Sequence, residues 1–208
     1  MPVVASSIIN RVRQQLVDNG ATQRWTDTEL LYWLSDGQRA IVSANPSASS
    51  TVATLALVVG TRQTLPTASF KLLNVYRNLT AGGVSGVSCL YVPRSVLDTQ
   101  YPNWHTASTA TSAVTHWTYD EIDPQAFYVY PRNDGTGSVE INYSANPTDV
   151  ASTSSNISVR DIYATALFDY VMFRAHSKDG DYAAGQGLAG AYWQSFTNYV
   201  AMNGGKAG

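Results

Sequence analysis

The chain has 208 residues, which is long enough to bury one good core, or a core and a subdomain. Its net charge of −2 offers no overall attraction for nucleic acid or an anionic membrane. Only 13% of the residues are charged, against about 25% in an average soluble protein. The chain is instead rich in aromatic residues, with 13 Tyr and 5 Trp. Such side chains are enriched at interfaces, so the composition favours an assembly subunit over a freely diffusing monomer.

The N-terminal residues show no pattern of a signal peptide. Residues 1–18 alternate polar and apolar side chains and include Arg11 and Arg13, so a continuous apolar core is missing. No apolar run approaches the roughly 20 residues that a bilayer span needs. Cys89 is the one cysteine, so an intrachain disulfide is excluded. We expect a soluble protein made in a cytoplasm and kept there, or released from it by lysis.

A first helix is predicted from apolar residues at four-residue spacing between Val4 and Leu16, and it should end at Asn19-Gly20. A second helix should begin at a capping box in which Thr26 is the N-cap and Glu29 its partner. Trp25 and Leu30 can form the hydrophobic staple over this box. The second helix should end at Asn45-Pro46, because the residue before a proline disfavours helical geometry.

A second pair of helices is predicted near the C-terminus. Ser158 and Asp161 have the spacing of another capping box, with Ile157 and Ile162 as its staple. This helix should stop near residues 179–181, where Gly180 tolerates the conformation of a helix end and Asp181 can cap the next helix. The apolar face of the last helix comprises Leu188, Tyr192, Phe196 and Tyr199 or Val200.

Between the helix pairs the apolar period changes from helical to two, which is typical of strands. Alternating segments occupy residues 53–59, 62–65, 72–77, 87–91, 114–119, 126–130 and 138–145. Residues 131–137 are predicted as a turn, Ser95 as the cap of one helical turn, and residues 101–113 as a long loop. The fold class is therefore α+β. We expect residues 1–50 and 151–208 to form one small helical bundle, with an inserted antiparallel β subdomain at residues 51–150.

Residues with catalytic or metal-binding chemistry are few. Asp120, Glu121 and Asp123 could hold a hard cation, but a polar turn between strands explains them better. The three histidines, His105, His116 and His176, are widely separated and lack metal-ligand spacing. Cys89 lies in a predicted strand and is expected to be a small buried hydrophobe. We expect no catalytic residues, no metal site and no cofactor.

Several segments, in order and spacing along nearly the whole chain, resemble a head-to-tail connector, or adaptor, protein of tailed bacteriophages. They are Arg24-Trp25-Thr26-Asp27, Asp36-Gly37-Gln38-Arg39-Ala40-Ile41, Gly60-Thr61-Arg62-Gln63-Thr64-Leu65-Pro66, Val75-Tyr76-Arg77-Asn78, Tyr101-Pro102-Asn103-Trp104-His105, Phe127-Tyr128-Val129-Tyr130-Pro131, Asp161-Ile162-Tyr163 and Phe173-Arg174-Ala175-His176.

The resemblance implies a structural virion protein of the neck, made in the host cytoplasm. It implies a cyclic homo-oligomer of about twelve copies beneath the portal protein, with heterologous contacts between copies. Such a ring extends the channel through which the genome leaves and gives tail tube or nozzle proteins a platform. Genomic DNA would pass without specific binding, because a basic lumen would hold it back. No membrane is expected as a partner.

Candidate contact residues follow from the same resemblance. It suggests that the C-terminal end docks on the portal, through Tyr199, Met202, Asn203 and Lys206; a frayed tail is the alternative. Trp104 and His105 are a second candidate, because an exposed Trp is an obvious contact anchor. The alternative is that Trp104 folds back to plug the β subdomain. Two other functions stay open: a tail-completion or tube-capping protein, and a metal-dependent hydrolase of the phage neck built on the acidic cluster.

Overall fold

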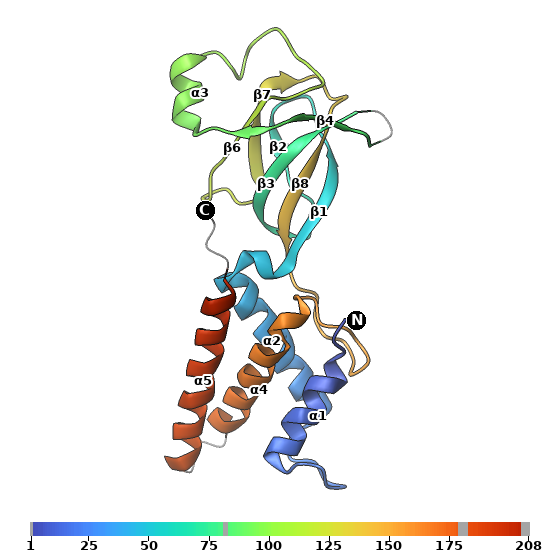
Figure 1. Cartoon of the computed structure of the whole chain (residues 1–208), viewed down its shortest axis with the longest axis vertical. Helices are drawn as coiled ribbons and strands as arrows, with labels where there is room; N and C mark the ends of the chain where they lie inside the picture. The colour runs from blue at the N-terminus through green and yellow to red at the C-terminus, as the bar shows by residue number, and fades with distance from the viewer. Residues whose placement is uncertain (1, 81–82, 179–182, 205–208) are drawn as a thin grey trace. The chain divides into compact units, whose positions relative to one another are not determined.

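The computed structural model describes residues 2–80, 83–178 and 183–204, and its fold is α+β, as predicted (Figure 1). The chain divides into two compact units. One, the helical unit, comprises Met1–Ser49 and Asn146–Gly208, and the other, the β unit, comprises Ser50–Ala145. The β unit is therefore an insertion between the two halves of the helical unit in sequence.

The N-terminal half of the helical unit contains α1 (Ala5–Leu16), α2 (Asp27–Ala44) and the short 3-10 helix η1 (Pro46–Ser49). The predicted N-cap of α2 is confirmed, since Thr26 Oγ1 accepts a hydrogen bond of 3.3 Å from the Glu29 N–H. Trp25 and Leu30, the predicted staple, are both buried. The helix ends at Asn45, as predicted, and the Asn45 N–H donates to the Ile41 carbonyl.

The C-terminal half contains the 3-10 helix η2 (Asp161–Tyr163), α4 (Ala164–Lys178) and α5 (Ala183–Asn203). Helix α4 contacts α1, α2 and α5 (Figure 1). The buried apolar side chains of these helices include Ile8, Val12, Leu30, Leu34, Ile41, Ala166, Leu167, Val171, Met172, Phe196 and Val200. Their helical spacing in the sequence is what places them on the inward faces.

The predicted capping box at Ser158 is wrong. The Ser158 hydroxyl pairs with the hydroxyl of Thr148 at 2.6 Å, and its N–H donates to the Gln38 side chain. Asp161 instead accepts from the Val3 N–H at 3.0 Å, and Ile162 is 49% exposed, so it closes no staple. Long-range partners, available only in the folded chain, thus replace the local capping bonds. The predicted helix end and cap at residues 179–181 lie outside the described residues.

The β unit contains two four-stranded sheets. The order of the first sheet is β1 (Ser50–Ala56), β8 (Ser138–Ala145), β3 (Ser69–Leu79) and β4 (Ser85–Ser88). The order of the second is β2 (Gly60–Thr64), β7 (Ala126–Asn133), β6 (His116–Tyr119) and β5 (Leu90–Tyr91). The pairs are antiparallel except for β5 with β6, which corrects the prediction of a purely antiparallel subdomain.

Apolar side chains from both sheets form the core of the β unit. It comprises Leu57, Leu65, Leu72, Val75, Cys89, Val114, Trp117, Phe127, Val129, Val139 and Ile141. Strand β7 continues through Asn133, so the turn predicted at residues 131–137 is shorter than expected. The helical turn predicted at Ser95 is the seven-residue helix α3 (Arg94–Gln100), whose N-cap is Pro93 and not Ser95. The sequence pattern therefore located these elements, but their ends were misplaced.

Candidate interfaces

Trp104, predicted as a candidate contact residue, is buried and only 1% exposed. Its Nε1 donates to Asp98 Oδ1 of α3 at 2.8 Å, and its ring lies at 76° to that of Tyr128, with centroids 6.1 Å apart. The indole therefore fastens α3 and the following loop to strand β7. It does not project as an exposed anchor; of the two alternatives, the inward-folded Trp104 is the one that the structure shows.

His105 lies on the other side of that indole. Its ring stacks on Trp104 with centroids 3.7 Å apart, and its Nδ1 forms a hydrogen bond of 2.8 Å with Thr61 Oγ1 of β2. Burial lowers the pKa of His105, and the positive charge of Arg94 lowers it further, whereas Asp98 opposes the shift. The histidine is therefore held toward its neutral form as a structural link between the loop and the second sheet.

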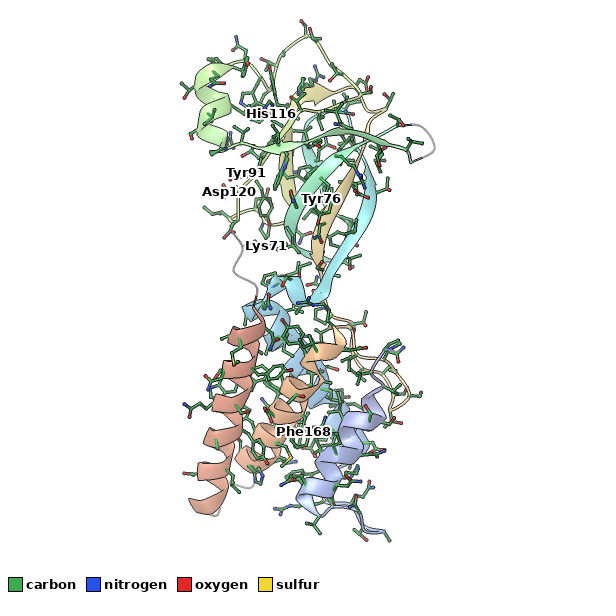
Figure 2. The ribbon with its side chains drawn as sticks, in the orientation of Figure 1. Lys71, Tyr76, Tyr91, His116, Asp120 and Phe168 are labelled. Carbon is green, nitrogen blue, oxygen red and sulfur yellow. The ribbon has the colours of Figure 1, made fainter. Side chains whose placement is uncertain are left out.

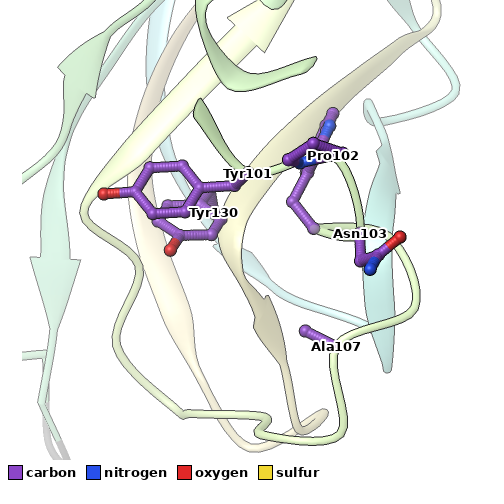
Figure 3. A pocket seen from close by; sticks show the side chains of 6 residues that line it. Tyr101, Pro102, Asn103, Ala107 and Tyr130 are labelled. Atoms are coloured by element: carbon purple, nitrogen blue, oxygen red, sulfur yellow. The ribbon is translucent and has the colours of Figure 1, made fainter. Parts of the chain in front are cut away.

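An aromatic pair is formed by Tyr101 of this loop and the half-buried Tyr130 of β7 (Figure 3). Their rings stack with centroids 4.9 Å apart and border a hollow of about 240 Å³, which is also lined by Pro102, Asn103 and Ala107. Tyr101 is 46% exposed. Burial raises the pKa of the Tyr130 hydroxyl, with a further contribution from Tyr101. The sequence indicated Trp104, beside Tyr101 and His105, as an exposed contact anchor, but the exposed ring of this loop is that of Tyr101.

At the C-terminal end of α5, hydrogen bonds hold the last helical turn in place. The Asn203 carbonyl accepts from Tyr163 Oη and from Asn45 Nδ2, both at 3.1 Å. The Tyr199 hydroxyl donates to the Ile162 carbonyl at 2.9 Å. Tyr199 and Asn203 therefore have internal roles, whereas Met202 is 85% exposed. Lys206, the fourth predicted contact residue of this group, lies outside the described residues.

An apolar groove of about 530 Å³ runs between α2 and α5 in the helical unit. Its lining residues are Ala40, Ala44, Asn45, Pro46, Trp193, Phe196, Thr197, Val200, Ala201 and Gly204. Trp193 is 43% exposed and tilts against Phe196 with ring centroids 5.5 Å apart. The pattern of the last helix predicted Phe196 and Val200 on its apolar face, but the groove beside them was not predicted.

The acidic cluster of the hydrolase alternative pairs with cations and backbone. Glu121 pairs with Lys71, labelled in Figure 2, at 2.5 Å, and Asp123 pairs with Arg62 at 3.1 Å. Asp120 accepts from the Ile122 N–H at 3.0 Å, which is the geometry of a turn. Within the described ranges, no three His, Cys, Asp or Glu side chains come together as a metal site would require. These contacts favour the turn interpretation over a metal site.

Cys89 has the environment of a buried structural thiol. It is 6% exposed, and burial raises its pKa to about 11. A thiol with such a pKa holds little thiolate at neutral pH, so it is a poor nucleophile.

A family model described as SU10 adaptor protein matches residues 5–207. The chain belongs to the SU10 adaptor protein family. This is a family of phage head-to-tail adaptors, so the resemblance noted from the sequence is confirmed. Comparison with curated proteins finds no match.

Membership of the SU10 adaptor family makes the chain a structural adaptor protein of a bacteriophage. It implies a location in the virion neck and association with portal and tail components. In the part of the chain that the structure describes, no helix is both long enough and apolar enough to cross a bilayer.

Proposed function

We propose that this SU10 adaptor forms a ring of about twelve copies under the portal, built from heterologous contacts between neighbouring copies. The ring extends the DNA channel and offers tail tube or nozzle proteins a platform. The match to the family over residues 5–207 carries this proposal. In it, the helices of residues 1–50 and 151–208 act as one bundle domain, and residues 51–150 act as an inserted β domain.

The portal contact in this proposal is the C-terminal end of α5. Met202 is its exposed apolar side chain, and Lys206 follows it in sequence. Tyr199 and Asn203 hold the end of the helix through their bonds to Ile162, Tyr163 and Asn45. Trp104 and His105 fix the loop that carries the exposed Tyr101. The ring of Tyr101, stacked on the half-buried Tyr130 of β7, is a second contact surface, for a tail-side neighbour.

Ion pairs between basic and acidic side chains support the passage of DNA without specific binding. Arg13, Arg39, Arg62, Lys71, Arg77, Arg94 and Lys178 are each within 4.0 Å of a carboxylate. Each of these pairs compensates a positive charge that could otherwise attract phosphates, and the whole chain carries a net charge of −2.

The direct test combines the purified chain with the portal protein of the same phage, followed by native mass spectrometry and electron microscopy. A portal-bound ring of the chain is the expected result. Met202→Glu should weaken portal binding about tenfold or more, because it places a charge in an apolar contact. The matched control is Val17→Glu, because Val17 is 86% exposed and lies at the end of α1, away from α5 in sequence. This variant should bind the portal like the wild-type chain.

The tail-completion alternative is judged by the same experiment. Binding to tail-tube proteins, with no binding to the portal, would replace the proposed function with that one. The hydrolase alternative predicts that a divalent cation raises the melting temperature and that Asp123→Asn abolishes this effect. An unchanged melting temperature would rule out the hydrolase alternative.

A further inference from the structure

Strands β1 and β4 are the two edges of the first sheet of the β unit (Figure 1). Strand β1 pairs with β8 along all seven of its residues, from Ser50 opposite Ser144 to Ala56 opposite Ser138. Strand β4 pairs with β3. Among the described residues, no further strand pairs with the outer side of either. Each edge therefore presents backbone groups that another strand can join.

Both edges lack charged side chains and proline, although β4 has only four residues and its register with β3 is shifted. Natural proteins place charged side chains or proline on such strands to prevent pairing with other chains. Neither β1, Ser-Thr-Val-Ala-Thr-Leu-Ala, nor β4, Ser-Gly-Val-Ser, contains either. Both expose a valine instead, Val52 at 54% and Val87 at 71%. Each edge thus exposes a β-branched apolar side chain, which favours a strand partner. In β4 the Val87 carbonyl already accepts a hydrogen bond of 2.9 Å from Asn78 Nδ2, so the remaining backbone groups of this strand would make the contact.

The outward face of the same sheet is polar and satisfied within the β unit. Val52 lies opposite Asn142, whose Nδ2 donates to the hydroxyl of Tyr76 at 3.0 Å (Figure 2). In the neighbouring row, Arg77 pairs with Glu140 at 2.8 Å. A partner that covered this face would have to desolvate these groups. A partner that joins the edge leaves them in water, so the edge is the better contact.

A second copy of the chain fits both edges by strand direction. Along the order β1, β8, β3, β4, every neighbouring pair is antiparallel. Strands β1 and β4 therefore run in opposite directions. If one copy is placed beside another in the same orientation, β4 of the first meets β1 of the second as one more antiparallel pair. The alternation then continues across the boundary between copies.

We propose that β1 of one copy pairs with β4 of the next, so that the first sheet continues from subunit to subunit. This inference rests on the proposed ring, and it names the contact that builds it. Two different edges meet, so the contact is heterologous, which is the type that closes a ring. Pairing of β1 with β1 would be an isologous contact. It would form a dimer in which neither β4 strand pairs with the other copy.

The test is a crosslink between the two edges in the full-length chain bound to portal. Val52→Cys and Val87→Cys are combined, and a short bismaleimide is used, because it tolerates a register difference that a disulfide does not. The expected product is a ladder of covalent oligomers. Wild-type chain, which retains buried Cys89, measures the background. The matched control is Val58→Cys with Val87→Cys, because Val58 is 58% exposed but lies outside β1.

The outcomes separate the two proposals. A ring on the portal with no crosslink above background overturns the edge pairing and leaves the adaptor role intact. Dimers from Val52→Cys alone overturn it in favour of β1–β1 pairing. If the wild-type chain does not bind portal, the adaptor role fails. The crosslink is then repeated with the concentrated chain alone. A ladder of oligomers would support the edge pairing, and a monomer would overturn it.

A charge on the edge gives an independent readout. Val52→Lys should reduce the number of chains bound per portal about tenfold at subsaturating concentration, because lysine blocks edge pairing. Val58→Lys should bind like wild type. Equal thermal unfolding of the two variants shows that the fold is retained. Full occupancy by Val52→Lys would overturn the proposal.

Discussion

The indole of Trp104 and the imidazole of His105 stack with their centroids 3.7 Å apart, although the two residues are adjacent in sequence. Each then bonds to a different element: Trp104 to Asp98 of α3 and His105 to Thr61 of β2. This pair makes the segment around Trp104 part of the β unit's folded structure, where the sequence alone had left open an exposed contact anchor.

Trp104→Ala should destabilise the β unit by about 3 kcal/mol or more, because it removes a large buried side chain and leaves a cavity. Urea denaturation followed by far-UV circular dichroism measures the loss. Tyr101→Ala, in the same loop but 46% exposed, should cost about 1 kcal/mol or less. Equal costs for the two variants would contradict the structural role of Trp104.

Stability should fall as the pH is lowered through the range in which His105 titrates. Its pKa in the folded chain lies below the ordinary value of 6.5, so the unfolded chain binds more protons in that range. The stabilisation is therefore present above the unfolded pKa and is lost as the pH falls through the folded pKa. Urea midpoints between about pH 5 and 8 test this. The slope should be smaller in His105→Gln, and parallel profiles for the two proteins would refute it.

Gly137→Ala should prevent folding of the β unit or destabilise it by about 2 kcal/mol or more. A Cβ at this position would lie 2.0 Å from the Ser112 carbonyl oxygen and 2.6 Å from Asn133 Nδ2. Gly190→Ala, in α5, is the matched control, since a Cβ there meets nothing within 4 Å. That change should stabilise the chain by about 0.5–1 kcal/mol through helix propensity. Thermal unfolding compares them, and destabilisation by both would count against this account.

Arg13→Met should destabilise the helical unit by about 3 kcal/mol. Arg13 is 5% exposed, and its guanidinium bonds to Asp18 at 2.9 Å and to Asp27 at 2.6 Å. Its removal leaves the buried Asp18 carboxylate without its cation. Arg39→Met breaks exposed pairs with Asp36 and Asp149 and should cost about 1 kcal/mol or less. Denaturant unfolding of both variants distinguishes the buried network from a surface pair.

Two sets of polar residues have hydrogen-bond partners that the sequence did not predict. The pattern around Ser158 is a valid capping box, but Thr148 and Gln38 compete for its hydroxyl and N–H in the folded chain. Asn203 and Tyr199 lie where a terminal contact was expected, yet Asn45, Tyr163 and Ile162 use their polar groups. Each competing partner is distant in sequence, so no local pattern contains it.

The sequence by itself determined the α+β class, the cap at Thr26, the helix end at Asn45 and most strands, because these depend on neighbours three or four residues apart or on alternation. It also contained the spaced segments that indicated a phage adaptor, which the family match confirms. Only the tertiary structure decided that Trp104 is buried and that Tyr101 is exposed. It likewise decided which strands end the first sheet. Burial and strand order depend on packing between distant segments, and the free energy of that packing is not contained in any single stretch of the chain.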